Sequence, residues 1–421
     1  MEIGAFIKLQ RIKHEMTQEE LARGIVSMSY LSKIENEKTV ASPEVISLLC
    51  TRLGIEVDSD KDITIKEKCQ NWYDSLFEVN DKQEIIAAYE ELEELISLVR
   101  SDSLAMFEIH KVRYYLVLGE YDKALEQINK LNDMSALFDN LHQFYWFKFK
   151  GNYNSLNGDF NNAMRFYKLA EEKISQIHLP EVEAADLNYT ISVTHSKLKN
   201  TLEAIDYAKK AINIFQKEYN FIRCAQCHIV LGISYRRIRM FDRTLENLNL
   251  AMQLGTLNNN QAIIQLVNQN LGYLHSTKGE PRKAIHYFEE VIADNTVKLD
   301  ERLLTTTYLI KEYYKVGMVD KTKEVIGKAL SLLKQAEYSV FHELFYYIIH
   351  TFKFAVNKEY KKFERLVSEK FIPYLKDRKD YSNLVIYSKM LGEHYERQKR
   401  YEDSVKYYKM ASKTYEQVVN L

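Results

Sequence analysis

Apolar side chains recur every three or four residues along most of this chain, a spacing that predicts amphipathic helices almost throughout. In the first sixty residues the pattern divides into four short segments, at 3–14, 17–25, 27–37 and 43–53. Three of them are preceded by residues that commonly cap helices, namely Thr17, Ser27 and Ser42. The chain is therefore predicted to begin with one compact unit of short helices.

The second and third of these segments read as two helices joined by a tight turn at Gly24. Leu31 and Ile34 give the third segment an apolar back, while Ser29 and Lys33 lie largely on its other side. An apolar back with short polar or flexible side chains in front is typical of a helix that enters the major groove of DNA. The segment at 27–37 is the predicted recognition helix.

From about residue 70 the chain repeats itself with a period of about 40 residues. The clearest copy is Gly-Glu-Tyr-Asp-Lys-Ala-Leu at 119–125, which marks a turn between two helices. A small residue recurs at one place in each copy, at positions 124, 163, 204, 244, 284, 322 and 404. Degenerate copies fit around 81–85 and 359–362, so about nine helical pairs of tetratricopeptide type are expected. We attribute the excess over the usual period of about 34 residues to longer loops between helices.

These patterns predict an all-α fold in which a helix-turn-helix domain precedes a right-handed tetratricopeptide-repeat solenoid of about nine hairpins. The expected domains are residues 1–60, the helix-turn-helix, and residues 70–421, the repeats. The segment 61–69 between them follows a run of charged residues and is expected to be a linker, although residues 63–68 also suit the start of the next helix.

Composition supports helices and limits the chemistry. Only 4 prolines and 13 glycines occur in 421 residues, and the net charge is −1. The first sixty residues hold seven basic and ten acidic side chains, which argues against strong nonspecific DNA binding and suggests that the reader works as a dimer.

Nothing in the sequence indicates catalysis. Cys224 and Cys227 form an isolated C-x-x-C within a helical pattern, which favours two small core-facing residues over a redox pair or a zinc site. No metalloprotease motif or glycine-rich phosphate loop occurs, so we expect no enzymatic activity, no metal and no cofactor. The absence of a signal peptide and of a long apolar run leads us to expect a cytosolic protein without membrane contact.

One known family combines these features. Residues 16–22 (Met-Thr-Gln-Glu-Glu-Leu-Ala) and 29–36 (Ser-Tyr-Leu-Ser-Lys-Ile-Glu-Asn) closely resemble the Xre/Cro-type helix-turn-helix. Such a head on a long tetratricopeptide solenoid resembles the cytosolic peptide-pheromone receptors of the Rap–NprR–PlcR–PrgX group. Rap proteins lack the head, and the PlcR and PrgX types are shorter, so the chain is most similar to the NprR type.

The resemblance implies a quorum-sensing transcription regulator that binds double-stranded promoter DNA. A short re-imported peptide would bind the concave face of the solenoid and change the conformation or the oligomeric state, with a homodimer or higher homo-oligomer as the working form. The alternative is an adaptor that binds or dephosphorylates a response regulator of the sporulation phosphorelay, either instead of DNA binding or as a second activity of the same chain.

The resemblance also assigns residues to DNA contact in the head. They lie at the start of the second helix, along the start of the third and just after it: Gln18, Ser27, Met28, Ser29, Tyr30, Lys33 and Lys38. Ser27 is equally suited to capping alone, and Tyr30 to the core. The predicted core of the head consists of Phe6, Leu21, Ile34, Leu48 and Leu53.

Peptide-binding candidates follow from counting back from the small residue of each turn to the inner face of the preceding helix. An extended peptide needs amide partners for its backbone, cations for its carboxylates and aromatic rings for its apolar side chains. The positions that satisfy these needs are Lys148, Asn152, Tyr189, Gln226, Arg236, Arg237, Gln269, Tyr273 and Lys311. Each of them is also compatible with a solvated side chain or with pairing inside the solenoid.

Overall fold

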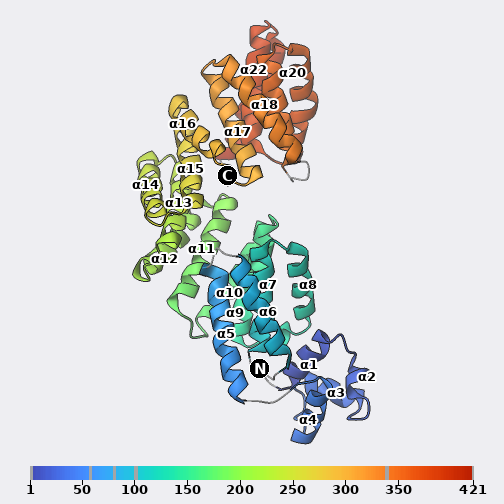
Figure 1. The fold of residues 1–421 in the computed structure, drawn as a ribbon. Coiled ribbons are helices and arrows are strands. Elements are labelled where there is room, and N and C mark those ends of the chain that lie inside the picture. The colour runs from blue at the N-terminus through green and yellow to red at the C-terminus, as the bar shows by residue number, and fades with distance from the viewer. Residues whose placement is uncertain (1–2, 56–58, 79–81, 99–102, 337–340, 420–421) are drawn as a thin grey trace. The chain divides into compact units, whose positions relative to one another are not determined.

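The computed structural model describes all residues except 1–2, 56–58, 79–81, 99–102, 337–340 and 420–421 (Figure 1). The described residues form helices and no strand, which confirms the predicted all-α class. The chain consists of two compact units, Met1–Asn220 and Phe221–Leu421. Within the described part, no helix combines the length and the apolar character needed to cross a bilayer.

The first unit begins with a head of four short helices, which are α1 (Ile3–Lys13), α2 (Gln18–Ala22), α3 (Met28–Glu35) and α4 (Pro43–Arg52). Their starts follow the predicted caps. Thr17 and Glu20 form the reciprocal hydrogen bonds of a capping box at α2. The Ser27 hydroxyl accepts from the Tyr30 amide at α3, and Gly24 adopts a left-handed φ of 72° in the turn between α2 and α3.

A buried ion pair holds three of these helices together. The carboxylate of Glu35, fully buried on α3, accepts from Arg11 Nε at 2.6 Å and from Arg11 Nη2 at 3.0 Å. Gln18 Nε2 donates to the same carboxylate at 2.7 Å, and Arg11 Nη1 donates to the carbonyl oxygen of Met16 at 2.8 Å. Every polar atom of the pair thereby gains a partner, as a buried charge requires.

The core of the head differs from the prediction at one position. Phe6, Leu21, Ile34 and Leu53 are buried, but Leu48 is 54% exposed. The next residue on α4, Leu49, is fully buried instead. Because successive helical residues are rotated by about 100°, α4 packs through a neighbouring stripe and turns Leu48 outward.

The expected linker at 61–69 lies within a helix, α5 (Ser59–Glu78), and that part of the domain prediction is therefore corrected. Ile65, Cys69, Trp72 and Leu76 are all buried, and their spacing of four, three and four residues forms one apolar stripe. The burial of this stripe outweighs the polar run that precedes it.

After the head, the described part of the first unit consists of helical hairpins, and so does the described part of the second unit. In the first unit they are α5 with α6 (Lys82–Leu98), α7 (Leu104–Leu118) with α8 (Tyr121–Asn132), α9 (Asn140–Leu156) with α10 (Phe160–Ile174), and α11 (Glu181–Lys197) with α12 (Thr201–Lys217). A short 3₁₀ turn, η1 (Ser135–Leu137), separates α8 from α9.

In the second unit they are α13 (Phe221–Arg237) with α14 (Phe241–Leu257), α15 (Gln261–Lys278) with α16 (Pro281–Ala293), α17 (Leu299–Lys315) with α18 (Val319–Gln335), α19 (His342–Val356) with α20 (Tyr360–Leu366), the π-helical η2 (Val367–Phe371) and α21 (Ile372–Asp377), and α22 (Tyr381–Arg397) with α23 (Tyr401–Val419). Across the described parts of both units this makes nine hairpins, the number that the repeats predict.

The long period arises from long helices, so the expectation of longer loops is wrong. The helices α11, α12, α13 and α14 each contain 17 residues. Connections of only three residues separate them, at 198–200, 218–220 and 238–240. The apolar stripe of α12 continues to Phe215 near its end, and this continued burial supports the additional turn of helix.

The small residues of the repeat lie at the helix–helix contacts. Ala124, Ala163, Ala204, Thr244, Ala284, Thr322 and Ser404 are all buried. Glycines of the preceding helices approach the same contacts closely. A Cβ atom on Gly272 of α15 would lie 2.4 Å from Phe288 Cε1 of α16, closer than two carbon atoms can pack.

Substitution of Gly272 with alanine is therefore expected to destabilise the second unit by about 1–3 kcal/mol, since the buried Phe288 ring must shift. Gly327 of α18 is the matched control, because a Cβ there meets no atom within 4 Å. Gly327→Ala is expected to stabilise the protein by about 0.5–1 kcal/mol through the helix propensity of alanine. Thermal and urea unfolding of both variants measures the difference, and equal shifts of the same sign would contradict the expectation.

Candidate functional site

The predicted recognition surface lies on α3 and the residues beside it. Met28, Ser29 and Lys33 are exposed, and Tyr30 is half-buried against the core of the head. The Ser27 hydroxyl caps α3 and lies 3.2 Å from the Ser29 hydroxyl. Lys38, just beyond the helix, is also exposed. The accessible side chains on this surface are thus short, polar or flexible, and their assignment to DNA stays a prediction.

Gln18 has a structural role that the sequence did not indicate. It occupies the first turn of α2, and its amide nitrogen donates to the buried Glu35. The side chain therefore fixes the start of α2 relative to α3. This hydrogen bond does not test the predicted contact of Gln18 with a DNA phosphate, which stays a prediction.

Most basic side chains of the head are engaged within the protein. Arg11 is paired with Glu35, and Lys8 Nζ lies 3.4 Å from the carbonyl oxygen of Asp133. Burial lowers the pKa of Lys13, whose ammonium faces the carboxylates of Glu108 and Glu93. Arg52 Nη1 donates to the carbonyl oxygens of Leu21 and Arg23. Among the described basic residues of the head, the exposed ones without such contacts are Arg23, Lys33 and Lys38.

Three of the predicted peptide-binding residues lie in the first unit. Lys148, fully buried on α9, forms ion pairs with Glu183 at 2.6 Å and Asp186 at 2.8 Å on α11. Asn152 accepts a hydrogen bond of 2.8 Å from the Tyr167 hydroxyl. Tyr189 is half-buried on α11. Lys148 and Asn152 thus contribute to packing between helices, and their peptide-binding roles stay predictions.

The second unit brings together two predicted cations and several aromatic rings, which we name the cation–aromatic cluster: Arg236, Tyr273, Tyr308, Lys311 and Tyr387. The Arg236 guanidinium lies 5.7 Å from the centre of the Tyr273 ring, and the Tyr273 and Tyr308 rings are 4.5 Å apart. Lys311 Nζ lies 4.8 Å from the Tyr308 ring and 5.5 Å from the Tyr387 ring.

The helices that carry this cluster are the first helices of four hairpins, namely α13, α15, α17 and α22 (Figure 1). Each contributes its side chains at helical spacing; Tyr308 and Lys311, for example, are three residues apart on α17. The cluster therefore combines side chains from four of the five hairpins in the described part of the second unit.

Lys311 is a buried cation without a carboxylate partner. It is 8% exposed, and none of the described residues forms an ion pair with it. Burial lowers its pKa to about 8, and the nearby Lys315 adds to this effect. Asp380 and Glu312 act in the opposite direction but do not compensate. A buried charge in this state favours an anion that supplies the missing partner.

Other polar atoms of the cluster also lack partners among the described residues. Arg236 Nε and the Tyr387 hydroxyl are buried without a hydrogen bond, whereas the Tyr273 hydroxyl faces Thr305. Burial lowers the pKa of Arg236 and raises that of Tyr273, so both groups would gain from a polar ligand. Buried polar groups are nearly always hydrogen-bonded in proteins, so these atoms are exceptions to that rule, and the role of this face in peptide binding stays a prediction.

The remaining predicted residues of this unit lie at different distances from the cluster along their helices. Gln269 is one turn before Tyr273 and donates to the Thr305 hydroxyl at 2.8 Å, so it adjoins the cluster. Gln226 lies near the start of α13 and accepts from Arg223 at 3.0 Å. Arg237 is exposed beside Arg236. The structure thus brings Arg236, Tyr273 and Lys311 together, with Gln269 next to them.

Sequence reasoning missed Tyr308 and Tyr387. The inward candidates include the residues 15 and 18 positions before the small residue of each turn. Tyr308 lies 14 residues before Thr322 and Tyr387 lies 17 before Ser404, each one residue from such a position. If a helix is rotated slightly from the orientation assumed in this count, a neighbouring residue faces inward instead of the selected one. A search for aromatic residues one turn from each predicted cation would have found Tyr308.

Comparisons with known proteins cover both parts of the chain. The helix-turn-helix family model matches residues 7–59, and the tetratricopeptide-repeat model matches residues 185–218 and 267–293. The transcriptional activator NprA of Geobacillus stearothermophilus is 31% identical over 407 residues, which cover 95% of this chain and 100% of NprA. Response regulator aspartate phosphatase E of Bacillus subtilis (strain 168) is 26% identical over 326 residues, 74% of this chain and 86% of that protein.

A solved structure gives the same fold. NprR in complex with its cognate peptide NprX superposes with a TM-score of 0.62 at 19% identity, over 83% of this chain and 98% of the NprR chain. At this level of identity the likeness concerns the arrangement of helices. The likeness in sequence to NprA extends over both the helix-turn-helix and the repeats.

Proposed function

This chain belongs to the family of NprA-like and NprR-like transcription regulators, and we propose that it is a cytosolic quorum-sensing regulator switched by a short peptide. In this proposal the head binds promoter DNA, and the re-imported signalling peptide occupies the repeats. The observation that carries the peptide site is the cation–aromatic cluster, where the buried Lys311, the half-buried Arg236 and polar atoms without a hydrogen bond would pair with an anionic ligand.

The chemistry of the cluster suits a peptide that carries a carboxylate. Arg236 and Lys311 would hold the carboxylate, and the rings of Tyr273, Tyr308 and Tyr387 would hold apolar side chains beside it. Gln269 offers an amide for the peptide backbone after exchanging its bond to Thr305. That NprR has been solved with a peptide supports a peptide as the ligand class.

The exposed residues of the head support modest affinity of a single head for DNA. Arg23, Lys33 and Lys38 provide three exposed cations, few for binding to the phosphate backbone. Helix-turn-helix proteins commonly place two heads on half-sites one helical turn of DNA apart. We therefore propose that the working form on DNA is a homodimer or a higher homo-oligomer.

Replacement of Lys33 with alanine is expected to weaken promoter binding by about tenfold and to reduce the slope of log affinity against log salt by about one per head. The reason is the loss of one exposed cation from the recognition helix without loss of packing. Fluorescence anisotropy on promoter DNA at several salt concentrations measures both quantities. Lys323→Ala, an exposed lysine of α18, is the control and should leave both unchanged.

The decisive experiment is a titration of the purified chain with synthetic peptides that correspond to a small secreted-peptide gene directly downstream of its own. Calorimetry reports peptide binding, and an electrophoretic shift on promoter DNA reports the switch. The proposal expects saturable binding together with a change in DNA affinity. If neither assay responds to any of these peptides, the peptide switch is rejected.

A second candidate function rests on the likeness to response regulator aspartate phosphatase E. In this alternative the repeats bind a response regulator of the sporulation phosphorelay and sequester or dephosphorylate it. Capture of purified response regulators on the immobilised full chain tests it, with the Lys33→Ala variant included. Capture by both forms would favour the alternative as an activity independent of DNA binding, and absence of capture would remove it.

A further inference from the structure

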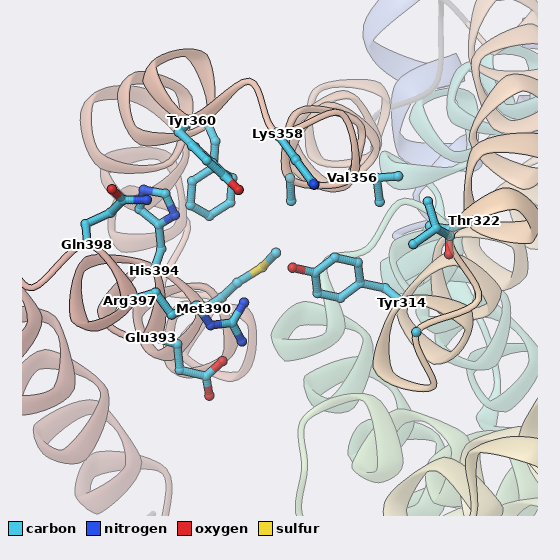
Figure 2. Close-up of a pocket in the computed structure, with 14 residues that line it drawn as sticks. Tyr314, Thr322, Val356, Lys358, Tyr360, Met390, Glu393, His394, Arg397 and Gln398 are labelled. Carbon is cyan, nitrogen blue, oxygen red and sulfur yellow. The ribbon is translucent and has the colours of Figure 1, made fainter.

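A pocket of about 390 Å³ lies in the second unit, outside the cation–aromatic cluster (Figure 2). It forms where the ends of α17, α19 and α22 meet the starts of α18 and α20. Its volume falls within the range of small-molecule sites, which begins at about 300 Å³. We name it the five-helix pocket, and its main contributors are Tyr314, Val356, Lys358, Phe363, Met390 and Arg397.

The pocket has an apolar interior. The Tyr314 ring is held by an edge-on contact with Phe352, 5.2 Å between centroids, and Phe363 is 2% exposed. Val356 and the thioether of Met390 complete this wall, and Figure 2 shows Met390 reaching toward the middle of the pocket. A thioether adapts to varied shapes, so the interior suits an aliphatic or aromatic group.

The charged residues around the pocket differ in whether they have an ion-pair partner. Glu393 lies 4.0 Å from Lys389, and His394 Nε2 lies 3.0 Å from Glu364 Oε1. Among the described residues, by contrast, no carboxylate forms an ion pair with Lys358 or Arg397, although both line the pocket. The two exposed cations that line the pocket are therefore available to a ligand.

The two cations approach the pocket from different elements, Lys358 from the turn between α19 and α20 and Arg397 from the end of α22. In Figure 2, Lys358 extends from one side and Arg397 from the opposite side, and the Tyr314 hydroxyl points into the space between them. An anionic group in this space would be reached by an ammonium, a guanidinium and a phenolic hydroxyl. A guanidinium binds a carboxylate with two parallel hydrogen bonds, which favours a planar anion.

We propose that the five-helix pocket binds an apolar group that carries a carboxylate, such as an N-acylated hydrophobic amino acid or the free C-terminal residue of a peptide. The apolar group occupies the wall of Tyr314, Phe363 and Met390, and the carboxylate lies between Lys358 and Arg397. This site is separate from the cation–aromatic cluster and does not depend on the proposed peptide switch.

The test uses the full chain and two probes that differ only in charge, N-acetylphenylalanine and N-acetylphenylalaninamide. Saturation-transfer NMR and calorimetry should show saturable binding of the acid, with the amide weaker by about tenfold or more, because a bond to a charged group is lost. Equal affinity of acid and amide, or no saturable binding of the acid, would overturn the proposal.

Variants then locate the site. Arg397→Gln and Lys358→Gln should each weaken the acid by about tenfold, since both residues are exposed and their replacement leaves the fold intact. Lys361→Gln, an exposed lysine that does not line the pocket, is the control and should bind as the parent does. Unchanged binding in both pocket variants would place the acid elsewhere and refute the assignment.

A last comparison distinguishes the two kinds of ligand that carry this chemistry, a small acid and the C-terminus of a peptide. N-acetyl-Ala-Ala-Phe with a free carboxylate binds more tightly than N-acetylphenylalanine if the pocket recognises a peptide terminus, and equally if it recognises a small acid. Either result supports the shared chemistry. Binding of the acid should also persist in Lys311→Met, and its loss there would show that the probe occupies the cation–aromatic cluster instead.

Discussion

Replacement of Lys311 with methionine is expected to weaken binding of the signalling peptide by about 10-fold to 100-fold while leaving the protein equally or more stable. The loss of affinity follows because a hydrogen bond to a charged group contributes about 1.5–3 kcal/mol. The gain in stability follows because Lys311 is a buried cation without a carboxylate partner among the described residues, and methionine fills similar space between Tyr308 and Tyr387 at no cost in charge burial.

Calorimetry of peptide binding and thermal unfolding of the same preparation measure the two effects together. Lys323→Met is the matched control, since that lysine is exposed on α18. It should change neither quantity appreciably. Strong destabilisation of the variant at position 311 would show that the lysine is needed for packing. Peptide binding equal to that of the parent would show that the lysine does not contact the ligand.

Lys311 also predicts a dependence on pH. Its pKa is lowered from 10.5 to about 8 in the folded protein, and a bound carboxylate would raise it again. Peptide affinity should therefore be highest below pH 8 and fall above it, by up to about tenfold per pH unit. Between the folded and the unfolded pKa the unfolded chain binds one more proton, so stability without peptide should rise with pH in that window. Both trends should vanish in Lys311→Met.

Replacement of Glu35 with glutamine is expected to destabilise the head by about 3–5 kcal/mol and to abolish promoter binding. Arg11 would then be left with a partly buried charge facing an amide, and Gln18 would lose its charged acceptor. The second unit shares no residue with this network, so peptide binding at the cation–aromatic cluster should be retained.

Hydrogen exchange followed by mass spectrometry resolves this effect, because α1 to α3 should lose protection while α13 to α18 keep it. Glu19→Gln removes the same charge from an exposed site on α2 and serves as the control. An electrophoretic shift on promoter DNA provides the functional reading. Equal protection of α1 to α3 in both variants would mean that the ion pair contributes little.

The regular features of the fold were predictable from the sequence because each repeat carries its own signal. The small residue of each turn lies at a helix–helix contact where a larger side chain would not fit, so Ala124, Ala163 and their counterparts mark the hairpins directly. The capping residues Thr17 and Ser27 mark helix starts in the same local way. Local rules of this kind need no knowledge of distant contacts.

The errors arose where distant packing decides the outcome. The polar residues near 60 indicated a linker, but burial of Ile65, Cys69 and Trp72 extends α5 through that segment. The pairing of Arg11 with Glu35 joins residues 24 positions apart and has no sequence signature. Tyr387 enters the cation–aromatic cluster from a helix 76 residues after Lys311, which only the stacking of hairpins determines.

The small number of exposed cations on the head has a consequence for the cell as a whole. If Arg23, Lys33 and Lys38 each meet one phosphate, log affinity falls with log salt with a slope of about −2.7 for one head and twice that for a pair. A threefold rise in ionic strength would then weaken a paired complex by more than about 100-fold. Under osmotic stress a cell would then need more regulator to keep the same promoter bound.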